Sequence, residues 1–147
     1  MLSLFRVCGA EEISAFVRPV SKHLANKRNL RTIQSMKAVF VEMPAFARFR
    51  DDYLDDDGYR DLQNAMMQNP KTGDVIEGTG GLRKLRHGDP RRGKGKRAGL
   101  RVIYYWWDGG SQFWLFTLYD KDEMDDLDAK TKRAFRDGLK AQLEKRR

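Results

Sequence analysis

The clearest structural signal in the chain is the segment LRVIYYWW, DGGS and QFWLFTLY, which runs from Leu100 to Tyr119. Residues 102–107 are all Val, Ile, Tyr or Trp, which are residue types that favour β-strands. The Asp-Gly-Gly-Ser segment at 108–111 is a strong signal for a tight turn between two strands. The pattern therefore predicts an antiparallel hairpin, with strands over 100–107 and 112–119.

Further elements are expected before this hairpin. Lys37 to Met43 has the side-chain alternation of a strand, with Val39 and Val41 opposite Phe40, and Leu82 to Arg86 predicts another strand. Pro44 suits the first turn of a helix, and Pro70 ends a second one. Apolar residues recur at helical spacing as Phe46, Phe49, Tyr53 and Leu54 in the first helix, and as Tyr59, Leu62, Ala65 and Met66 in the second.

One more helix is expected after the hairpin. It carries Phe135, Leu139 and Leu143 on one side, and Asp125, Asp126 and Asp128 before it are candidate caps. The predicted order is β-α-α-β-β-β-α. We predict an α+β fold in which the two N-terminal helices and the C-terminal helix pack on one side of a small antiparallel sheet.

The predicted elements all belong to residues 36–147, which we interpret as one domain. The preceding segment, residues 1–35, has scattered cations and an apolar pattern interrupted by Pro19. We interpret it as an N-terminal extension that is either disordered or a result of the choice of start site, with Met36 as the alternative start. An N-terminal peptide containing Cys8 in the natively expressed protein would refute that interpretation.

The composition excludes several classes of protein. No apolar run approaches the ~20 residues that a membrane span needs, and Arg6 interrupts the only apolar stretch near the N-terminus. We therefore expect a cytoplasmic protein. Cys8 is the only cysteine and there are two histidines, so neither an intrachain disulfide nor a zinc site built from Cys and His is expected. We expect no cofactor.

Positive charge is concentrated in one segment. Residues 82–101 carry nine Lys or Arg and one acid, a net +8 that equals the net charge of the whole chain. Residues 102–147, by contrast, carry nine cations and nine acids. A local field of this kind attracts phosphates, so we predict that residues 82–101 meet RNA or a similar polyanion.

Strand alternation predicts how this segment is displayed. It places Arg101, Ile103 and Tyr105 on one face of their strand, and Val102 and Tyr104 on the other. If strands 82–86, 100–107 and 112–119 are neighbours, their cations can converge on one face.

Three runs of sequence together resemble a known family. They are GDVIEGTGGLRKLR (73–86), GKGKRAGLRVIYYW (93–106) and LYDKDEMDDL (118–127), and the opening KAVFVEMPAFARFRDDYL (37–54) agrees with them. This combination resembles the RelE/HigB-like toxins of bacterial type II toxin–antitoxin systems, in the HigB branch. The resemblance covers Met36 to about Leu143.

The resemblance implies a RelE-like α+β fold and a ribosome-dependent endoribonuclease that cuts mRNA in the A site of the 70S ribosome. It also implies a cognate antitoxin with a helix-turn-helix domain, which would neutralise the toxin and hold the complex on operator DNA. Lys121 matches the cation that the family places on the strand before the last helix. RelE-type members often carry a functional Tyr near the chain end, whereas here no Tyr follows Tyr119.

The residue types suggest how such cleavage would proceed without a metal. Attack of a ribose 2′-OH on the adjacent phosphate needs a base, an acid and stabilisation of a phosphorane-like transition state. We predict Lys84 or Lys94 as the proton-transfer group, because neighbouring like charge lowers a lysine pKa. Arg86 and Arg101 are predicted to stabilise the phosphate, with Lys121 as a second cation. RNA contacts are predicted for Arg83, Arg91, Arg92, Lys96, Arg97, Tyr105 and Tyr119.

Several features also have plain structural interpretations. Strand aromatics such as Trp106, Trp107, Trp114 and Phe116 are more often core than RNA-stacking residues, and aspartates at 55–57 and 120–128 are more often turn or cap residues than metal ligands. Two rival functions stay open: a ParE-like toxin that acts on DNA gyrase, and a non-catalytic RNA-binding protein.

Overall fold

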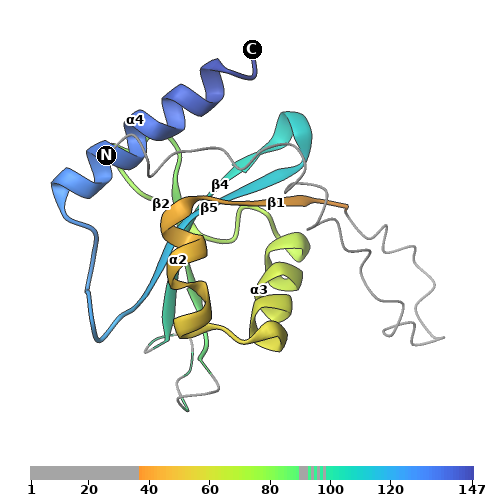
Figure 1. Cartoon of the computed structure of the whole chain (residues 1–147), viewed down its shortest axis with the longest axis vertical. Coiled ribbons are helices and arrows are strands. Elements are labelled where there is room, and N and C mark those ends of the chain that lie inside the picture. The colour runs from red at the N-terminus through yellow and green to blue at the C-terminus, as the bar shows by residue number, and fades with distance from the viewer. Residues whose placement is uncertain (1–36, 90–92, 94, 96, 98) are drawn as a thin grey trace.

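The computed structural model describes residues 37–147 except 90–92, 94, 96 and 98 (Figure 1). Several predictions therefore lie outside the described residues. They concern the extension at 1–35, the alternative start at Met36, and the side chains of Arg91, Arg92, Lys94 and Lys96.

One five-stranded sheet forms the centre of the described part of the chain. Its spatial order is β1-β5-β4-β3-β2. Every neighbouring pair is antiparallel except β1 and β5, which are parallel. The strands are β1 (Val39–Glu42), β2 (Asp74–Val75), β3 (Arg83–His87), β4 (Leu100–Trp107) and β5 (Gln112–Asp120).

The predicted α+β class is confirmed, but the predicted sheet was wrong in two respects. The sheet is mixed rather than antiparallel, because β1 pairs in parallel with β5. The order is also β-α-α-β-β-β-β-α, because the two-residue strand β2 was missed. Alternation along β1 carries no information about the direction of its partner. Both residues of β2 are exposed, so β2 has no apolar pattern to detect.

The predicted hairpin is confirmed as β4 and β5. The turn between them is a short 3-10 segment, Asp108–Gly110, followed by Ser111 in the left-handed region at φ 50°. The register shifts between Ile103 and Tyr104, which is a β-bulge in this hairpin. The turn also supports the sheet edge, because the Ser111 carbonyl accepts a hydrogen bond of 3.0 Å from the Val39 N–H.

Three helices complete the described fold: α2 (Pro44–Tyr53), α3 (Asp56–Gln68) and α4 (Ala129–Glu144). The predicted start at Pro44 is confirmed. The cap interpretation of the aspartates is confirmed for Asp55 and Asp128, whose side chains accept hydrogen bonds from the backbone N–H groups of Gly58 at 2.7 Å and Thr131 at 2.6 Å.

The helices cover both faces of the sheet, so the prediction that they share one side was wrong (Figure 1). On one face, Phe46 of α2 and Leu62 of α3 pack with Tyr104 and Phe113. On the other, residues of α4 pack with the alternate residues of the same strands, which are Ile103, Trp114 and Phe116. Apolar residues point to both sides of β4 and β5, which is typical of strands buried on both faces.

Within the described residues, no helix is both long enough and apolar enough to cross a membrane.

Candidate nucleic-acid interface

The strand register brings four of the predicted site residues to one face of the sheet. Arg86 is opposite Arg101 across β3 and β4, and Arg101 is opposite Tyr119 across β4 and β5. Lys84 is opposite Ile103, which belongs to the α4-side core. Residues two apart on a strand share a face, so Lys84, Arg86, Arg101 and Tyr119 all lie on the α4 side. We call these four residues the β3–β5 cluster.

An acidic side chain from the loop before α4 holds Lys84. Asp126 Oδ1 lies 3.3 Å from Nζ of Lys84, and Asp126 Oδ2 lies 3.2 Å from Nζ of Lys132 on α4. Burial opposes ionisation of this carboxyl, but the hydrogen bonds from the Leu127 N–H and Lys132, together with the charge of Lys84, outweigh it. They hold the pKa of Asp126 below its usual range. The carboxylate therefore joins two cations at the edge of the cluster.

Arg101 and Tyr119 form the covered floor of the cluster. Arg101 is 5% exposed, and its guanidinium donates hydrogen bonds to the carbonyls of Arg97 at 2.8 Å and Leu100 at 3.4 Å. Tyr119 is 3% exposed, and its hydroxyl has no hydrogen-bond partner among the described residues. Burial first, and then the charge of Asp126, raises the pKa of Tyr119 to about 12, although Arg101 opposes this shift. Tyr119 is therefore a neutral hydroxyl at physiological pH.

Two further predicted residues, Arg97 and Lys121, lie with Arg86 at the open edge of this face. All three are exposed. The Lys121 N–H donates to the Gly99 carbonyl at 3.3 Å, so Lys121 lies where β4 begins. Gly99 is required here, because a Cβ on it would lie 2.4 Å from the His87 carbonyl oxygen. The absence of a side chain at Gly99 therefore lets the end of β3 and the start of β4 lie close together.

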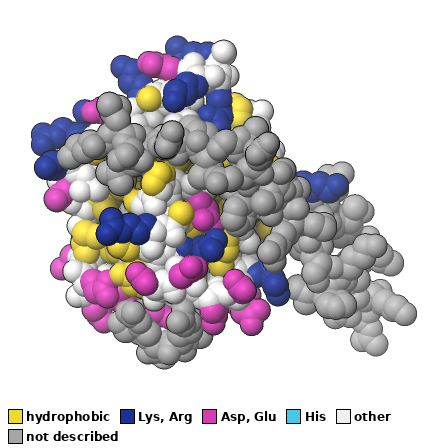
Figure 2. Space-filling view, viewed as in Figure 1, with side chains coloured by type: hydrophobic (Ala, Val, Ile, Leu, Met, Phe, Trp, Pro, Cys, Tyr) yellow, Lys and Arg dark blue, Asp and Glu magenta, His cyan; other side chains and the backbone are white. Residues whose placement is uncertain are grey.

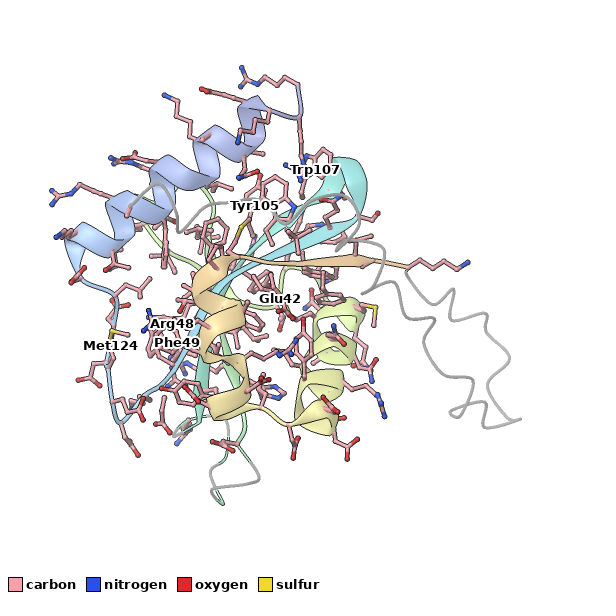
Figure 3. The ribbon with its side chains drawn as sticks, in the orientation of Figure 1. Glu42, Arg48, Phe49, Tyr105, Trp107 and Met124 are labelled. Atoms are coloured by element: carbon pink, nitrogen blue, oxygen red, sulfur yellow. The ribbon has the colours of Figure 1, made fainter. Side chains whose placement is uncertain are left out.

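Two predicted RNA contacts lie away from the β3–β5 cluster. Arg83 is opposite Tyr104, on the α2–α3 face, and its guanidinium donates to the carbonyls of Gly73 at 2.7 Å and Lys71 at 3.2 Å. Tyr105 shares the face of Arg101 but lies about 13 Å farther along β4, at ~3.3 Å per residue. There its ring packs on Trp114 at 5.3 Å, and Figure 3 shows it apart from Met124 in the loop before α4.

The aromatic residues divide as their structural interpretation predicted. Trp114 and Phe116 are fully buried in the α4-side core, whereas Trp106 and Trp107 are half-buried beside the two cores. Tyr119 was predicted to contact RNA, and a base could stack on its ring only if the residues above it moved. None of these aromatics is an open stacking platform at the cluster.

Asp126 and Lys132 were missed by the sequence reasoning as members of the site. Asp126 was considered as a cap or turn residue and, less favoured, as a metal ligand, and Lys132 was not considered. Lys132 lies at the start of a helix rich in cations, and this position was the signal from which it could have been found. Within the residues described, no group of three or more His, Cys, Asp or Glu is placed to hold a metal ion.

This arrangement is suited to holding a phosphate. Exposed cations lie at the edge of a covered floor made of a guanidinium and a neutral hydroxyl, which are both hydrogen-bond donors. A comparison of the chain with models of known protein families finds no match. The resemblance to RelE/HigB-like toxins therefore stays an expectation drawn from the sequence runs themselves.

Proposed function

We propose that this chain is the toxin of a type II toxin–antitoxin system and cuts translated mRNA on the ribosome as a metal-independent endoribonuclease. The observation that supports this best is the shared face of Lys84, Arg86, Arg101 and Tyr119. Three strands contribute donors and cations there, which is what cleavage of a phosphodiester would need.

The proposed reaction uses the RNA's own nucleophile. The ribose 2′-oxygen forms a bond to the adjacent phosphorus as its proton passes to a base, and the bond from phosphorus to the 5′-oxygen breaks as that oxygen gains a proton. The products are a 2′,3′-cyclic phosphate and a 5′-hydroxyl. Lys84 or Lys94 would transfer the proton, and Arg86, Arg101 and Lys121 would stabilise the charge of the pentavalent phosphorus.

The proposed partners follow from the same resemblance. They are the A site of the 70S ribosome with its mRNA, and a helix-turn-helix antitoxin that would connect the complex to operator DNA. The substrate is a translated message, so the protein would act in the cytoplasm.

The test is cleavage on purified ribosomes. Wild-type protein is added to 70S ribosomes programmed with a defined mRNA, and the 5′ ends of the RNA are mapped with and without prior kinase treatment. We expect new ends within translated codons that can be ligated only after phosphorylation by the kinase, because cleavage leaves a 5′-hydroxyl.

Three other results would contradict the proposal. RNA binding without new 5′ ends would indicate a non-catalytic RNA-binding protein. Inhibition of DNA gyrase without new ends would indicate a ParE-like toxin. New ends that carry a 5′-phosphate would exclude attack by the 2′-OH.

A further inference from the structure

The C-terminal segment, which comprises α4 and the three residues after it, carries a strong positive charge that the β3–β5 cluster does not use. Residues 129–147 contain eight Lys or Arg and two acids, whereas the preceding residues 120–128 contain six acids and one Lys. The net charge of residues 102–147 is zero, because the positive charge of the basic segment is cancelled by the acids elsewhere in this range. Figure 2 shows Lys and Arg side chains gathered over α4, and acidic side chains gathered at the opposite end of this view.

Four of these cations form one stripe along this segment. Lys132, Arg136 and Lys140 are four residues apart, which keeps them on one side of α4 at 3.6 residues per turn. Arg147 follows the end of α4 and borders the same groove as Arg136 and Lys140. Arg136, Lys140 and Arg147 are exposed and Lys132 is half-buried. We call this set the α4 stripe.

Helix stability does not account for the α4 stripe. Like charges four residues apart destabilise a helix by a few tenths of a kcal/mol for each pair. Cations stabilise the helix dipole only within the last turn, and the last turn of α4 contains none. The one acid that pairs with the stripe on α4 is Asp137, 3.4 Å from Arg136, and both are exposed. Such a pair contributes little and is easily replaced.

The stripe borders a groove that separates α4 from the turn before β3. Thr79 and Gly80 form the wall opposite α4. The α4 wall combines the cations with two leucines and one acid, and its residues are Arg136, Leu139, Lys140, Leu143, Glu144 and Arg147. A groove edged by cations along its length matches the repeating charge of a nucleic-acid backbone.

The stripe is continuous with the β3–β5 cluster. Lys132 is its first member, and the two oxygens of Asp126 contact Lys132 at 3.2 Å and Lys84 at 3.3 Å. A polyanion bound at Lys84 would therefore pass one carboxylate, Asp126, which both lysines partly neutralise, before it reached the remaining cations of the stripe.

We infer that the α4 stripe is a second RNA-binding surface, which contacts the phosphate backbone of structured RNA beside the strand held at the β3–β5 cluster. The choice of RNA as the polyanion rests on the proposed function. A protein partner fits less well, because hot spots of protein interfaces are rich in buried aromatic anchors and the groove is lined by none.

The experiment measures how salt weakens binding to a fluorescein-labelled RNA hairpin. The test variant is R136Q/K140Q, which removes two stripe cations and leaves Lys84 and Lys132 in place. The matched control is R48Q/R60Q, because Arg48 on α2 and Arg60 on α3 are exposed and their loss changes net charge equally. Circular dichroism verifies that both variants are folded.

The slope of log affinity against log salt is negative, and each lost duplex contact reduces its magnitude by about 0.9. We expect R136Q/K140Q to reduce that magnitude by about 1.8 and the control to leave it unchanged. Between 50 and 200 mM salt, wild-type affinity should then fall roughly tenfold more than that of the variant.

Three outcomes would overturn the inference. One is that R136Q/K140Q and R48Q/R60Q have the same slope as wild type. Another is that the wild-type chain fails to bind the hairpin. The third is that, at 150 mM salt, a poly-glutamate peptide binds more tightly than the RNA hairpin and displaces it. That result would indicate that the groove binds an acidic protein segment. Mapping of 5′ ends with the same proteins distinguishes failure of this inference from failure of the proposed function. Cleavage without an effect of R136Q/K140Q on binding would contradict only the α4 stripe, and stripe-dependent binding without cleavage would contradict only the proposed endoribonuclease.

Discussion

The two faces of the central sheet carry different kinds of residues at the same end of strands β3, β4 and β5. On the α2–α3 face, Leu85, Leu100 and Leu118 are all at most 8% exposed and belong to one apolar core. At the neighbouring positions on the α4 face lie Lys84, Arg86, Arg101 and Tyr119. One end of strands β3, β4 and β5 is therefore an apolar core on one side of the sheet and a polar site on the other.

The largest expected effect is a loss of stability on the α2–α3 face. Leu85 lies between Lys84 and Arg86 on β3 and is 8% exposed. Leu85→Ala should lower the free energy of unfolding by about 2–5 kcal/mol, because it removes buried methyl groups and leaves a cavity. Urea denaturation measures this, with Lys84→Ala as the control from the other face, where less than 1 kcal/mol is expected. Equal losses for the two variants would contradict the comparison.

A charged pair on the α2–α3 face, Arg50 and Glu42, should also contribute to the free energy of unfolding. Nη1 of Arg50 lies 2.7 Å from Glu42, which is 9% exposed, and the guanidinium stacks over Tyr59 at 5.1 Å. Arg50→Ala should cost about 1–3 kcal/mol, since it leaves a largely buried carboxylate without this cation.

A double-mutant cycle with Glu42→Gln tests the interaction of this pair, because the two losses should be less than additive. Full additivity of the two losses would show that Arg50 and Glu42 do not stabilise each other.

The hydroxyl of Tyr119 should differ from the Arg50–Glu42 pair, because we expect that its removal does not destabilise the fold. Its buried hydroxyl has no partner among the described residues, so Tyr119→Phe should raise the free energy of unfolding at pH 7 by about 1 kcal/mol. A destabilisation of that size would contradict this, since it would mean that the hydroxyl is well hydrogen-bonded.

The raised pKa of Tyr119 also makes the free energy of unfolding depend on pH, and the direction of the pKa shift gives the sign of this dependence. Its folded value of about 12 lies above the ordinary value of 10, so its contribution is full below pH 10 and is lost as pH rises towards 12. Tyr119→Phe should therefore reduce the loss of stability over that window and remove one late step from the ultraviolet titration of the tyrosines. An unchanged titration would place the late step on another tyrosine.

The smallest expected effect concerns Asp126. Its pKa is lowered in the folded state, so its contribution is present above the ordinary carboxyl pKa and is lost as pH falls below it. Asp126 is half-exposed, so Asp126→Asn should cost only a few tenths of a kcal/mol at neutral pH and should flatten the acid limb of stability. Asp125→Asn is the neighbouring control, and equal acid limbs for both variants would contradict the role of Asp126.

Much of the fold could be predicted, because local chemistry determines it. The turn at 108–111, the helix start at Pro44 and the cap at Asp128 each depend on a few adjacent residues, and all three are confirmed. The direction of β1 and the side on which α4 packs depend on contacts between distant segments. No periodicity within a single strand or helix reports those contacts, so both predictions were wrong.

The candidate site was predicted to a similar extent. Alternation correctly placed Arg101 with Ile103 and Tyr105, since period two is a local property. The face of Arg83 and Lys84 depends on the register between β3 and β4, which the sequence does not give. Asp126 contacts Lys84 across 42 positions of sequence, so only the folded chain could reveal it.

Arg83 and Lys84 are adjacent cations on opposite faces of the sheet, so a comparison of their variants shows which face carries the proposed chemistry. Ribosome-dependent mRNA cleavage is measured for Lys84→Ala and Arg83→Ala at equal folded concentration. If the α4 face carries the chemistry, Lys84→Ala should lose roughly 10²–10⁴-fold in cleavage rate, while Arg83→Ala should stay close to wild type. Loss of cleavage in Arg83→Ala with full cleavage in Lys84→Ala would contradict the account.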